Sequence, residues 1–307
     1  MKSSTFTFKD SEGAEIFCYR WAPDSKPVAA VQISHGMAEH AARYAEFAER
    51  LTQAGFVVYA NDHRGHGKTA GSLEKAGHFA DKNGWKLTVQ NLKDLNDLIR
   101  KEQGDIPCFM LGHSMGSFLA RNYMHLHGDT LKGVILSGSG GTPGVVLAGG
   151  RMAAKMAMVT GKRKKPSPTL DKMSFGSFNS KFAPNRTAFD WLSRDNEHVD
   201  RYINDPFCGF ICTGTFFHEV LGGIKAIQKK SNIARIPKTL PIFIVAGAND
   251  PVGNNTRALS QLIDTYTKAG IKNVEHKFYT DARHEILNEI NREEVYADIV
   301  NWLKKQM

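Results

Sequence analysis

A serine enclosed by two glycines follows directly on an apolar run near the middle of the chain. Residues 106–110 read IPCFM, and residues 111–117 read LGHSMGS. Glycine loses more backbone entropy on folding than any other residue and has no side chain to pack, so both glycines would be costly inside a helix or a strand. The spacing instead predicts a sharp turn from a strand into the helix-like stretch 117–127.

The motif GHSMG fits the G-x-S-x-G pattern of a nucleophile elbow. In such a turn the Oγ atom of Ser114 is exposed at the carboxyl edge of a sheet, and the N-terminus of the following helix favours negative charge that develops there. A five-residue pattern also occurs by chance in ordinary Gly-Ser turns. The strand before it and the helix after it favour a nucleophilic serine here.

A nucleophilic serine needs a base, and the base needs an acid that orients it. For an elbow of this kind the chain order is serine, acid, histidine. Asp250 follows the run PIFIVAG, and His284 lies between the last strand-like run and a C-terminal helix. We therefore predict Ser114, Asp250 and His284 as the catalytic residues. Asp281 is the alternative acid, and the competing interpretation of Asp250 and His284 is that both are polar residues of turns or helix starts.

Acyl transfer also requires hydrogen-bond donors for the oxyanion. The donors expected with an elbow are one backbone N–H next to the nucleophile and one in the loop after the third strand. They belong to Met115 and to Met37, which lies in the loop HGMAEHAARY. We expect the substrate to contact His113 and Gly36, where the lack of a side chain lets the backbone approach. The position of His35 directly after a strand favours a functional role for this residue.

The segment DHRGHGKT follows the strand-like run FVVYAN. Its charged residues and glycines raise the question of phosphate or metal binding, but they match neither the GxxxxGK[ST] pattern nor a dinucleotide fingerprint. We predict a structural loop in which Asp62 and Arg64 pair with each other. We predict no metal site and no cofactor.

Eight runs rich in apolar, aromatic or β-branched residues predict strands. In chain order they are TFTF, EIFCYRW, VAAVQIS, FVVYAN, IPCFMLG, KGVILSG, PIFIVAG and VEHKFYT. The first runs follow one another closely, as antiparallel strands do, and the later runs alternate with helical patterns, as in a doubly wound parallel sheet. The sequence therefore predicts an α/β protein.

About a hundred residues separate the sixth strand-like run from the seventh, and a plain loop of that length is uncommon in a compact domain. We predict an inserted cap over residues 139–238 and a core built from residues 1–138 and 239–307. The predicted cap has 16 Lys and Arg against 7 Asp and Glu, which accounts for the whole formal net charge of +9.

Apolar residues recur at helical spacing in the predicted cap, with basic residues between and after them. The apolar positions are Leu147, Met152, Met156 and Val159, and the basic positions are Arg151, Lys155, Lys162, Arg163, Lys164 and Lys165. A helix of this kind can lie on an anionic membrane surface. The other interpretation is that the apolar residues pack on the core and the basic residues face water. We expect peripheral contact with an anionic membrane and no nucleic-acid partner.

The four cysteines form no CxxC pair, and the N-terminal residues MKSSTFTFKD lack the apolar core of a signal peptide. No uninterrupted apolar stretch approaches the roughly 18 residues of a membrane span. We expect packed thiols in a reducing compartment, and a cytoplasmic protein whose contact with membranes is peripheral.

These motifs resemble the α/β-hydrolase superfamily, and within it the monoacylglycerol lipase and lysophospholipase-like branch, which is grouped with serine aminopeptidase-like hydrolases. The motifs in chain order are SHGMAEHAARY, DHRGHGKT, GHSMGS, NDPFCGF, GANDPVG and ARHEILNE. The resemblance implies an eight-stranded, mostly parallel sheet flanked by helices, a helical cap after the sixth strand, hydrolysis of single-acyl esters and no cofactor. Ala38 stands where many relatives have glycine.

The leading hypothesis is a serine hydrolase that cleaves carboxylic esters of small amphiphilic lipids, monoacylglycerol or lysophospholipid, through an acyl-enzyme. A general short-chain carboxylesterase is an alternative. An aminopeptidase or amidase with the same triad would need an acidic group in the cap, and the basic cap disfavours it, although Glu219 alone would suffice. A ligand-binding receptor with an inactive pocket is the third hypothesis, which a turnover assay would distinguish. Haloalkane and epoxide chemistry would require aspartate in place of Ser114.

Overall fold

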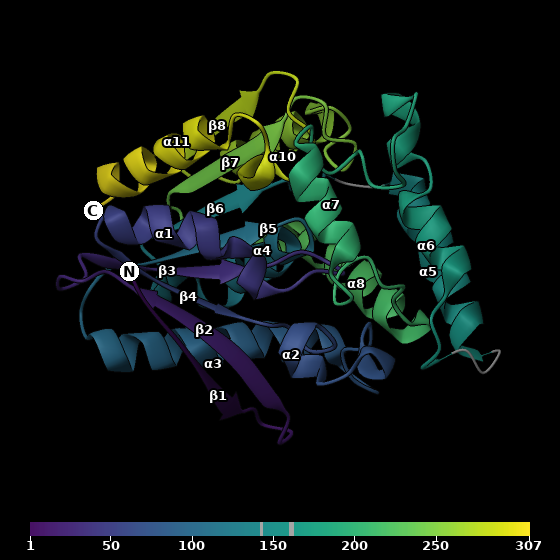
Figure 1. Ribbon diagram of the computed structural model, residues 1–307, viewed down its shortest axis with the longest axis horizontal. Helices are drawn as coiled ribbons and strands as arrows, with labels where there is room; N and C mark the ends of the chain where they lie inside the picture. The colour runs from purple at the N-terminus through teal and green to yellow at the C-terminus, as the bar shows by residue number, and fades with distance from the viewer. Residues whose placement is uncertain (142–143, 160–162) are drawn as a thin grey trace.

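The computed structural model of the protein describes residues 1–141, 144–159 and 163–307 and contains one eight-stranded sheet (Figure 1). The strand order is β1-β2-β4-β3-β5-β6-β7-β8. The strands are β1 (Lys2–Lys9), β2 (Glu15–Ala22), β3 (Ala29–Ser34), β4 (Phe56–Asn61), β5 (Cys108–His113), β6 (Gly133–Ser137), β7 (Ile242–Gly247) and β8 (Val274–Tyr279). Each of the eight predicted runs overlaps one of them, which confirms the predicted strands.

The first two strands are antiparallel to their neighbours, and the other strands are parallel, as predicted. Every residue of β3, β4, β5, β6 and β7 is buried. Parallel strands that are covered on both faces are nearly continuous apolar runs rather than alternating ones. This explains why these strands could be recognised in the sequence as apolar runs.

Helices cover both faces of the sheet. They are α1 (Ala45–Gln53), α2 (Gly67–Ala70), α3 (Gly84–Gln103), α4 (Met115–His127), α5 (Gly144–Val159), α6 (Pro168–Phe175), α7 (Asn196–Asn204), α8 (Gly214–Ile227), α9 (Lys230–Ile233), α10 (Arg257–Lys268) and α11 (Arg292–Lys305). Short 3-10 helices occupy Ala41–Tyr44, Leu73–Lys75, Gly128–Thr130, Phe178–Phe182 and Ile286–Asn288.

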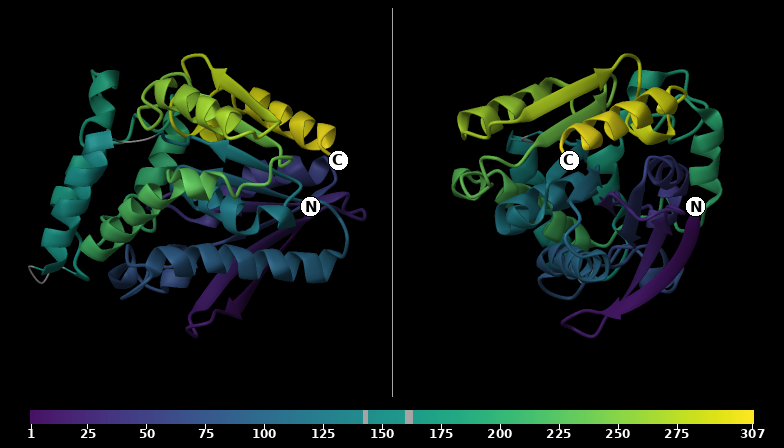
Figure 2. Two further views of the ribbon diagram at one scale, coloured as in Figure 1. Left: turned by 180° about the vertical axis from the view of Figure 1, so that it is seen from behind. Right: turned by 90° about the vertical axis from the view of Figure 1, so that its left-hand side faces the viewer.

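Two apolar layers lie on opposite sides of the sheet. One contains α1 and α11, which face the viewer in Figure 1, and the other contains α3, α4 and α10. The view from behind in Figure 2 shows α3 and α10 over the second face. In α1, Phe47 packs on Tyr296 of α11 with ring centroids 5.0 Å apart. Burial of such apolar stripes against the sheet is the main source of stability for this arrangement.

Helices α5 to α9 lie between β6 and β7 in sequence, and the parallel strands point toward them (Figure 1). The two termini lie at the other end of the molecule. α8 ties this insertion to the rest of the fold, because it packs against α3 and α4 as well as α5. A Cβ atom on Gly223 would lie 2.1 Å from the Trp85 ring, so the two helices approach closely there. The helical insertion after the sixth strand is confirmed.

Within the described ranges, no helix has both the length and the apolar character that a membrane span requires. All four cysteines are buried free thiols, which confirms the predicted packing of these residues. In the predicted basic helix, Met152 and Met156 of α5 are 65% and 57% exposed. Lys162 lies outside the described residues.

Candidate active site

Ser114 is the turn residue between β5 and α4. Its φ and ψ angles are 51° and −119°, a conformation that is strained for a residue with a side chain. A Cβ atom on Gly116 would lie 1.9 Å from the carbonyl oxygen of Ser34, and one on Gly112 would lie 2.4 Å from the carbonyl oxygen of Gly116. The two glycines are therefore required, because Gly116 packs against the end of β3 and Gly112 against the start of α4 with no room for a side chain.

The side chains of Ser114, His284 and Asp250 lie in one hydrogen-bonded series. The Nε2 atom of His284 is 2.9 Å from Ser114 Oγ, and its Nδ1 atom is 3.0 Å from each carboxylate oxygen of Asp250. The three residues follow β5, β7 and β8, whose carboxyl ends meet at one edge of the sheet. Asp281, the alternative acid, is exposed in the turn after β8.

Burial and charge act in opposite directions on His284. Burial alone would disfavour its protonated form, but the Asp250 carboxylate outweighs burial and raises the pKa of His284 above its usual value. The His113 ring lies 4.8 Å from that of His284, centroid to centroid. Burial, together with the neighbouring His284, lowers the pKa of His113 to about 4, so His113 is neutral near pH 7. The arrangement can accept a proton at His284 and deliver it again.

The loop after β3 runs beside Ser114. A Cβ atom on Gly36 would lie 3.3 Å from the Cβ atom of Ser114, so this loop approaches the serine closely. The backbone N–H of Met37 has no acceptor among the described residues, and Met115 is the first residue of α4, whose N–H has no acceptor inside the helix. Both N–H groups are thus available beside Ser114.

A buried ionic network, which sequence reasoning missed, lies beneath this loop. Arg43 bonds Glu39 at 2.5 Å and Glu285 at 2.7 and 2.8 Å. Glu39 also accepts the N–H of Gly36 at 2.5 Å and the hydroxyl of Tyr44 at 2.9 Å. Burial opposes the charge on Glu285, but Arg43 holds the pKa of Glu285 at about 2. The network joins the loop after β3 to the loop of His284. Two features of the sequence could have indicated it, the four-residue spacing of Glu39 and Arg43 and the position of Glu285 next to His284.

Two cavities meet at Ser114. The larger, of about 590 Å³, is mainly apolar, and the smaller, of about 380 Å³, also reaches His284. Residues that line both are Met37, Ser114 and Phe175. Gly36 and His113, the expected substrate contacts, line the smaller cavity together with Asp171 and Lys172 of α6, and Met115 lines the larger. Cavities of this size are typical of small-molecule sites.

The functional role expected for His35 is wrong. Its ring is fully buried, its Nδ1 atom bonds the carbonyl oxygen of Gly36 at 2.8 Å, and its Nε2 atom accepts the N–H of His63 at 2.9 Å. His35 therefore holds the loops after β3 and β4 together and lines neither of the two cavities. The ring of His63 lies 4.1 Å from that of His35, and His66 is 5.2 Å away.

The predicted pair of Asp62 and Arg64 does not form. Arg64 bonds Asp10, at the end of β1, at 2.6 and 2.9 Å. Asp62 instead accepts the backbone N–H groups of Ala41 and Lys68, each at 2.8 Å. The strand order explains the difference, because it brings the start of the chain beside the loop after β4.

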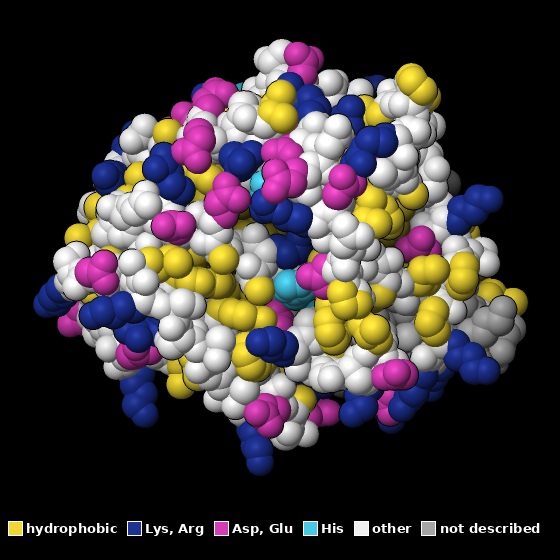
Figure 3. All heavy atoms as spheres, viewed as in Figure 1, with side chains coloured by type: hydrophobic (Ala, Val, Ile, Leu, Met, Phe, Trp, Pro, Cys, Tyr) yellow, Lys and Arg dark blue, Asp and Glu magenta, His cyan; other side chains and the backbone are white. Residues whose placement is uncertain are grey.

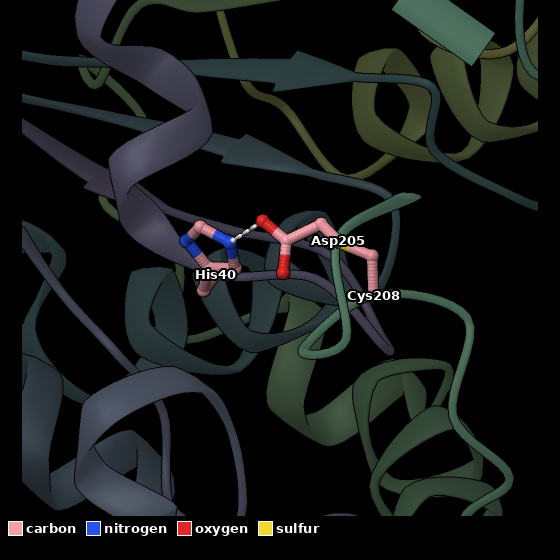
Figure 4. A group of neighbouring side chains, drawn as sticks. All are labelled: His40, Asp205 and Cys208. Carbon is pink, nitrogen blue, oxygen red and sulfur yellow. Dashed lines mark hydrogen bonds and ion pairs between the residues drawn. The ribbon is translucent and has the colours of Figure 1, made fainter. Parts of the chain in front are cut away.

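Three potential metal ligands, His40, Asp205 and Cys208, lie together between the loop after β3 and the insertion (Figure 4). Their donor atoms lie within 4.8 Å of one another, and His40 Nε2 is 2.8 Å from Asp205 Oδ2. Burial raises the pKa of the Cys208 thiol, so the thiolate that binds metals is disfavoured. The group fits a hydrogen-bonded bridge between loop and insertion better than a metal site.

Comparisons with known proteins agree with this geometry. The sequence model of the family described as "Serine aminopeptidase, S33" matches residues 25–291. The monoglyceride lipase of Rattus norvegicus is 29% identical over 92% of this chain and 87% of its own length. The monoacylglycerol lipase of Mycolicibacterium smegmatis is 27% identical over 98% of this chain and 96% of its own length. The crystal structure of a thermostable carboxyl esterase from Bacillus coagulans superposes with a TM-score of 0.92 at 29% identity, covering 99% of both chains.

A mostly parallel sheet of eight strands, with a serine at the turn from β5 to α4, defines an α/β-hydrolase. The chain belongs to the serine aminopeptidase S33 family and resembles the monoglyceride lipases within it. It is a hydrolase.

Proposed function

We propose that the protein is a serine hydrolase that cleaves the carboxylic ester of a single-acyl lipid, a monoacylglycerol or a lysophospholipid, through an acyl-enzyme. The observation that carries the proposal is the hydrogen-bonded series of Ser114, His284 and Asp250 at the meeting point of two cavities. The names of the two lipases reported above support the same class of substrate, and the name of the esterase supports a carboxylic ester as the bond that is cleaved.

In this mechanism His284 takes the proton of Ser114 as the hydroxyl oxygen attacks the ester carbonyl. Asp250 holds the imidazole in the required tautomer and stabilises its protonated form. The N–H groups of Met37 and Met115 stabilise the oxyanion. His284 then gives its proton to the departing alcohol. A water molecule that His284 activates attacks the acyl-enzyme and releases the fatty acid.

The two cavities suit the two parts of such a substrate. The larger cavity is lined by Leu170, Met173, Phe178, Phe217, Val220, Leu221 and Ile224, among others. An apolar wall of this kind favours burial of an acyl chain. The smaller cavity has the polar side chains of Asp171 and Lys172 and suits the alcohol part. Residues 139–238 act in this proposal as the cap that supplies most of these walls.

An aminopeptidase or amidase remains the second candidate, because one observation favours it. Asp171, in the cap, lines the smaller cavity, where a carboxylate could bind a substrate ammonium. Burial raises the pKa of Asp171, which weakens it for that purpose. The carboxylate of Glu219 accepts the backbone N–H of Trp85 at 3.0 Å, so it is already engaged at α3. The ester therefore remains the favoured bond.

One rate series tests these alternatives. The wild-type protein is assayed with monoacylglycerols and lysophospholipids of several chain lengths, short aryl esters and aminoacyl arylamides. We expect the highest kcat/KM for a monoacyl lipid. A preference for the aminoacyl arylamides would support the second candidate, and a preference for the short esters would support a general carboxylesterase. No turnover of any of them would favour the receptor hypothesis.

We also propose that the cap contacts anionic membranes peripherally. Met152 of α5 and Met173 of α6 are 65% and 57% exposed, and Lys155, Lys164 and Lys165 are exposed nearby in the sequence. Figure 3 shows hydrophobic and basic side chains together on the right-hand side of the molecule, where α5 and α6 lie in Figure 1. Exposed apolar side chains next to basic ones are typical of surfaces that bind the interface of an anionic bilayer.

A further inference from the structure

The ring of Trp191, a residue of the insertion, lies against the ring of His284. The two centroids are 5.1 Å apart and the ring planes are inclined by 32°. Trp191 is 9% exposed and lines the smaller cavity beside Ser114. A side chain of the cap is therefore in contact with the imidazole that bonds Ser114.

The backbone of the same segment is fixed to the loop of His284. The carbonyl oxygen of Trp191 accepts the N–H of His284 at 3.4 Å, and that of Leu192 accepts the N–H of Glu285 at 2.7 Å. On its other side, the N–H of Trp191 donates to the Oδ1 atom of Asn179 at 2.9 Å. The position of the indole relative to the imidazole is thus set by hydrogen bonds on both sides.

Aromatic neighbours hold the indole from the direction of the cap. Phe178 packs edge-on against Trp191 with centroids 5.2 Å apart, and Phe175 stacks on it at 6.0 Å. Phe175 also lines both cavities. The indole therefore lies between the walls of the proposed substrate site and His284, and these contacts restrict its rotation.

Most of the charged groups around His284 are paired with other residues. Asp250 bonds the Nδ1 atom of the ring directly. Glu39 and Glu285 are both paired with Arg43. His113 is neutral near pH 7, as described above. Besides Asp250, the indole is a neighbour whose interaction with His284 strengthens when the ring gains a proton, because the π face of tryptophan attracts a cation within about 6 Å.

We propose that Trp191 is a positioning residue for His284, which holds the imidazole toward Ser114 and stabilises its protonated form by a cation–π interaction. The protonated ring is the form that exists while the oxyanion is present in the proposed mechanism. The cap would thereby contribute to the chemical step as well as to substrate binding. The kinetic part of this inference rests on the proposed function, and the titration of the ring does not.

The first experiment follows the His284 imidazole by NMR in the full chain, with its resonance assigned by its loss in His284→Gln. In Trp191→Leu the pKa of His284 should fall by about 0.5 to 1, because the protonated ring loses its aromatic partner. Trp191→Phe should lower it less. Phe178→Leu is the matched control, since it removes an aromatic ring that touches Trp191 and keeps the indole, and it should lower the pKa of His284 much less than Trp191→Leu does.

A second measurement keeps the shape of the side chain. Fluorotryptophan is incorporated biosynthetically in place of tryptophan. Its fluorine withdraws electron density from the indole ring and so weakens a cation–π interaction, with little change in packing. The chain has 4 tryptophans, so the labelled Trp191→Phe variant reports the effect of the other three. Incorporation of fluorotryptophan should lower the pKa of His284 in the wild-type chain and leave it unchanged in Trp191→Phe.

The kinetic readout is the pH profile of kcat/KM with a short aryl ester. The base must be neutral to act, so a lower pKa of His284 moves the acid limb of this profile to lower pH. The plateau of kcat/KM should fall about 3- to 10-fold, because the protonated ring is less stable. An unchanged pKa in Trp191→Leu and in the fluorinated chain, or an equal fall in Phe178→Leu, would overturn the proposal. A shifted pKa with no turnover of any ester would instead contradict the proposed function alone.

Discussion

Tyr202 of α7 donates a hydrogen bond to the carbonyl oxygen of Ala38 at 3.0 Å, and the N–H of Gly209 donates to the same oxygen at 2.9 Å. Ala38 has a φ angle of 53°, which is uncommon for a residue other than glycine. These two hydrogen bonds from the insertion hold the residue next to Met37 in that conformation. A glycine at this position would adopt it without strain.

Tyr202→Phe removes one of these two bonds and keeps the ring. We expect kcat/KM for a soluble ester to fall about fivefold, because a hydrogen bond of about 1 kcal/mol no longer holds the loop of Met37. Tyr123→Phe is the matched control, since it removes a buried hydroxyl that bonds Thr130 at 2.8 Å far from Ser114. A comparable loss of kcat/KM in the control would mean that lower stability, and not the loop, explains the result.

Ser114→Ala should abolish turnover and leave the fold intact, because the lost hydroxyl is small. Loss of a triad member typically lowers kcat by about a million-fold. An alkyl fluorophosphonate should label the wild-type chain at Ser114, which mass spectrometry of the peptides can locate. Labelling that persists in Ser114→Ala would identify another nucleophile.

Asp250→Asn should lower kcat by about ten-thousand-fold, because an amide can stabilise neither the required tautomer nor the protonated form of His284. Asp281→Asn should leave kcat close to that of the wild type, since Asp281 is exposed in the turn after β8. Steady-state kinetics with one soluble ester compares the two variants directly. If Asp281→Asn were the more damaging change, the assignment of the acid would be wrong.

The buried histidines His35, His63 and His66 should make the fold sensitive to acid. Burial lowers the pKa of His63 to about 3, that of His66 to about 4, and that of His35 well below its usual value. Below about pH 6.5 the unfolded chain binds protons that the folded chain does not, so each ring lowers the free energy of unfolding by up to about 1.4 kcal/mol per pH unit. Urea unfolding between pH 7 and pH 5 measures this slope.

His66→Phe provides the control for this slope. The ring of His66 already lies among Phe79, Phe210 and Phe216, with centroids 5.3 to 6.0 Å apart. A phenyl ring fits these neighbours and binds no proton, so the pH dependence should decrease by the equivalent of about one proton. An identical slope in His66→Phe and in the wild type would show that other groups control the acid transition.

Membrane contact should depend on the basic and apolar residues of the cap. The double variant Lys155→Gln, Lys165→Gln should reduce binding to anionic vesicles by up to about 30-fold, because each basic residue near such a surface contributes about 1 kcal/mol. Hydrolysis of a short soluble ester should remain unchanged. Vesicle co-sedimentation at low and high salt measures the binding.

Two further variants complete the membrane experiment. Lys101→Gln, Lys304→Gln removes the same charge from exposed positions at the ends of α3 and α11, and it should bind vesicles like the wild type. Met152→Gln, Met173→Gln should reduce binding without changing the net charge. Equal binding by the cap variant and by the charge control, or binding that salt does not weaken, would exclude the cap as the docking surface.

The strands β3 to β7 were predictable because buried parallel strands have to be apolar along nearly their whole length, as in FVVYAN of β4. The turn at Ser114 was predictable because two glycines at that spacing have few other uses. The pairing of Arg64 with Asp10 was not, because it depends on a strand order that places the end of β1 near the loop after β4. The contact of Trp191 with His284 depends in the same way on how the insertion packs.

The ionic network of Glu39, Arg43 and Glu285 constrains how this chain can change over evolutionary time. The side chains of the three residues are 4%, 11% and 7% exposed, and they come from two loops far apart in the sequence. Removing one partner of a buried ion pair costs about 3 to 5 kcal/mol, a large share of the 5 to 15 kcal/mol by which most domains are stable. Single substitutions at these positions should therefore be selected against, and we expect a descendant that loses Arg43 to change the two glutamates as well.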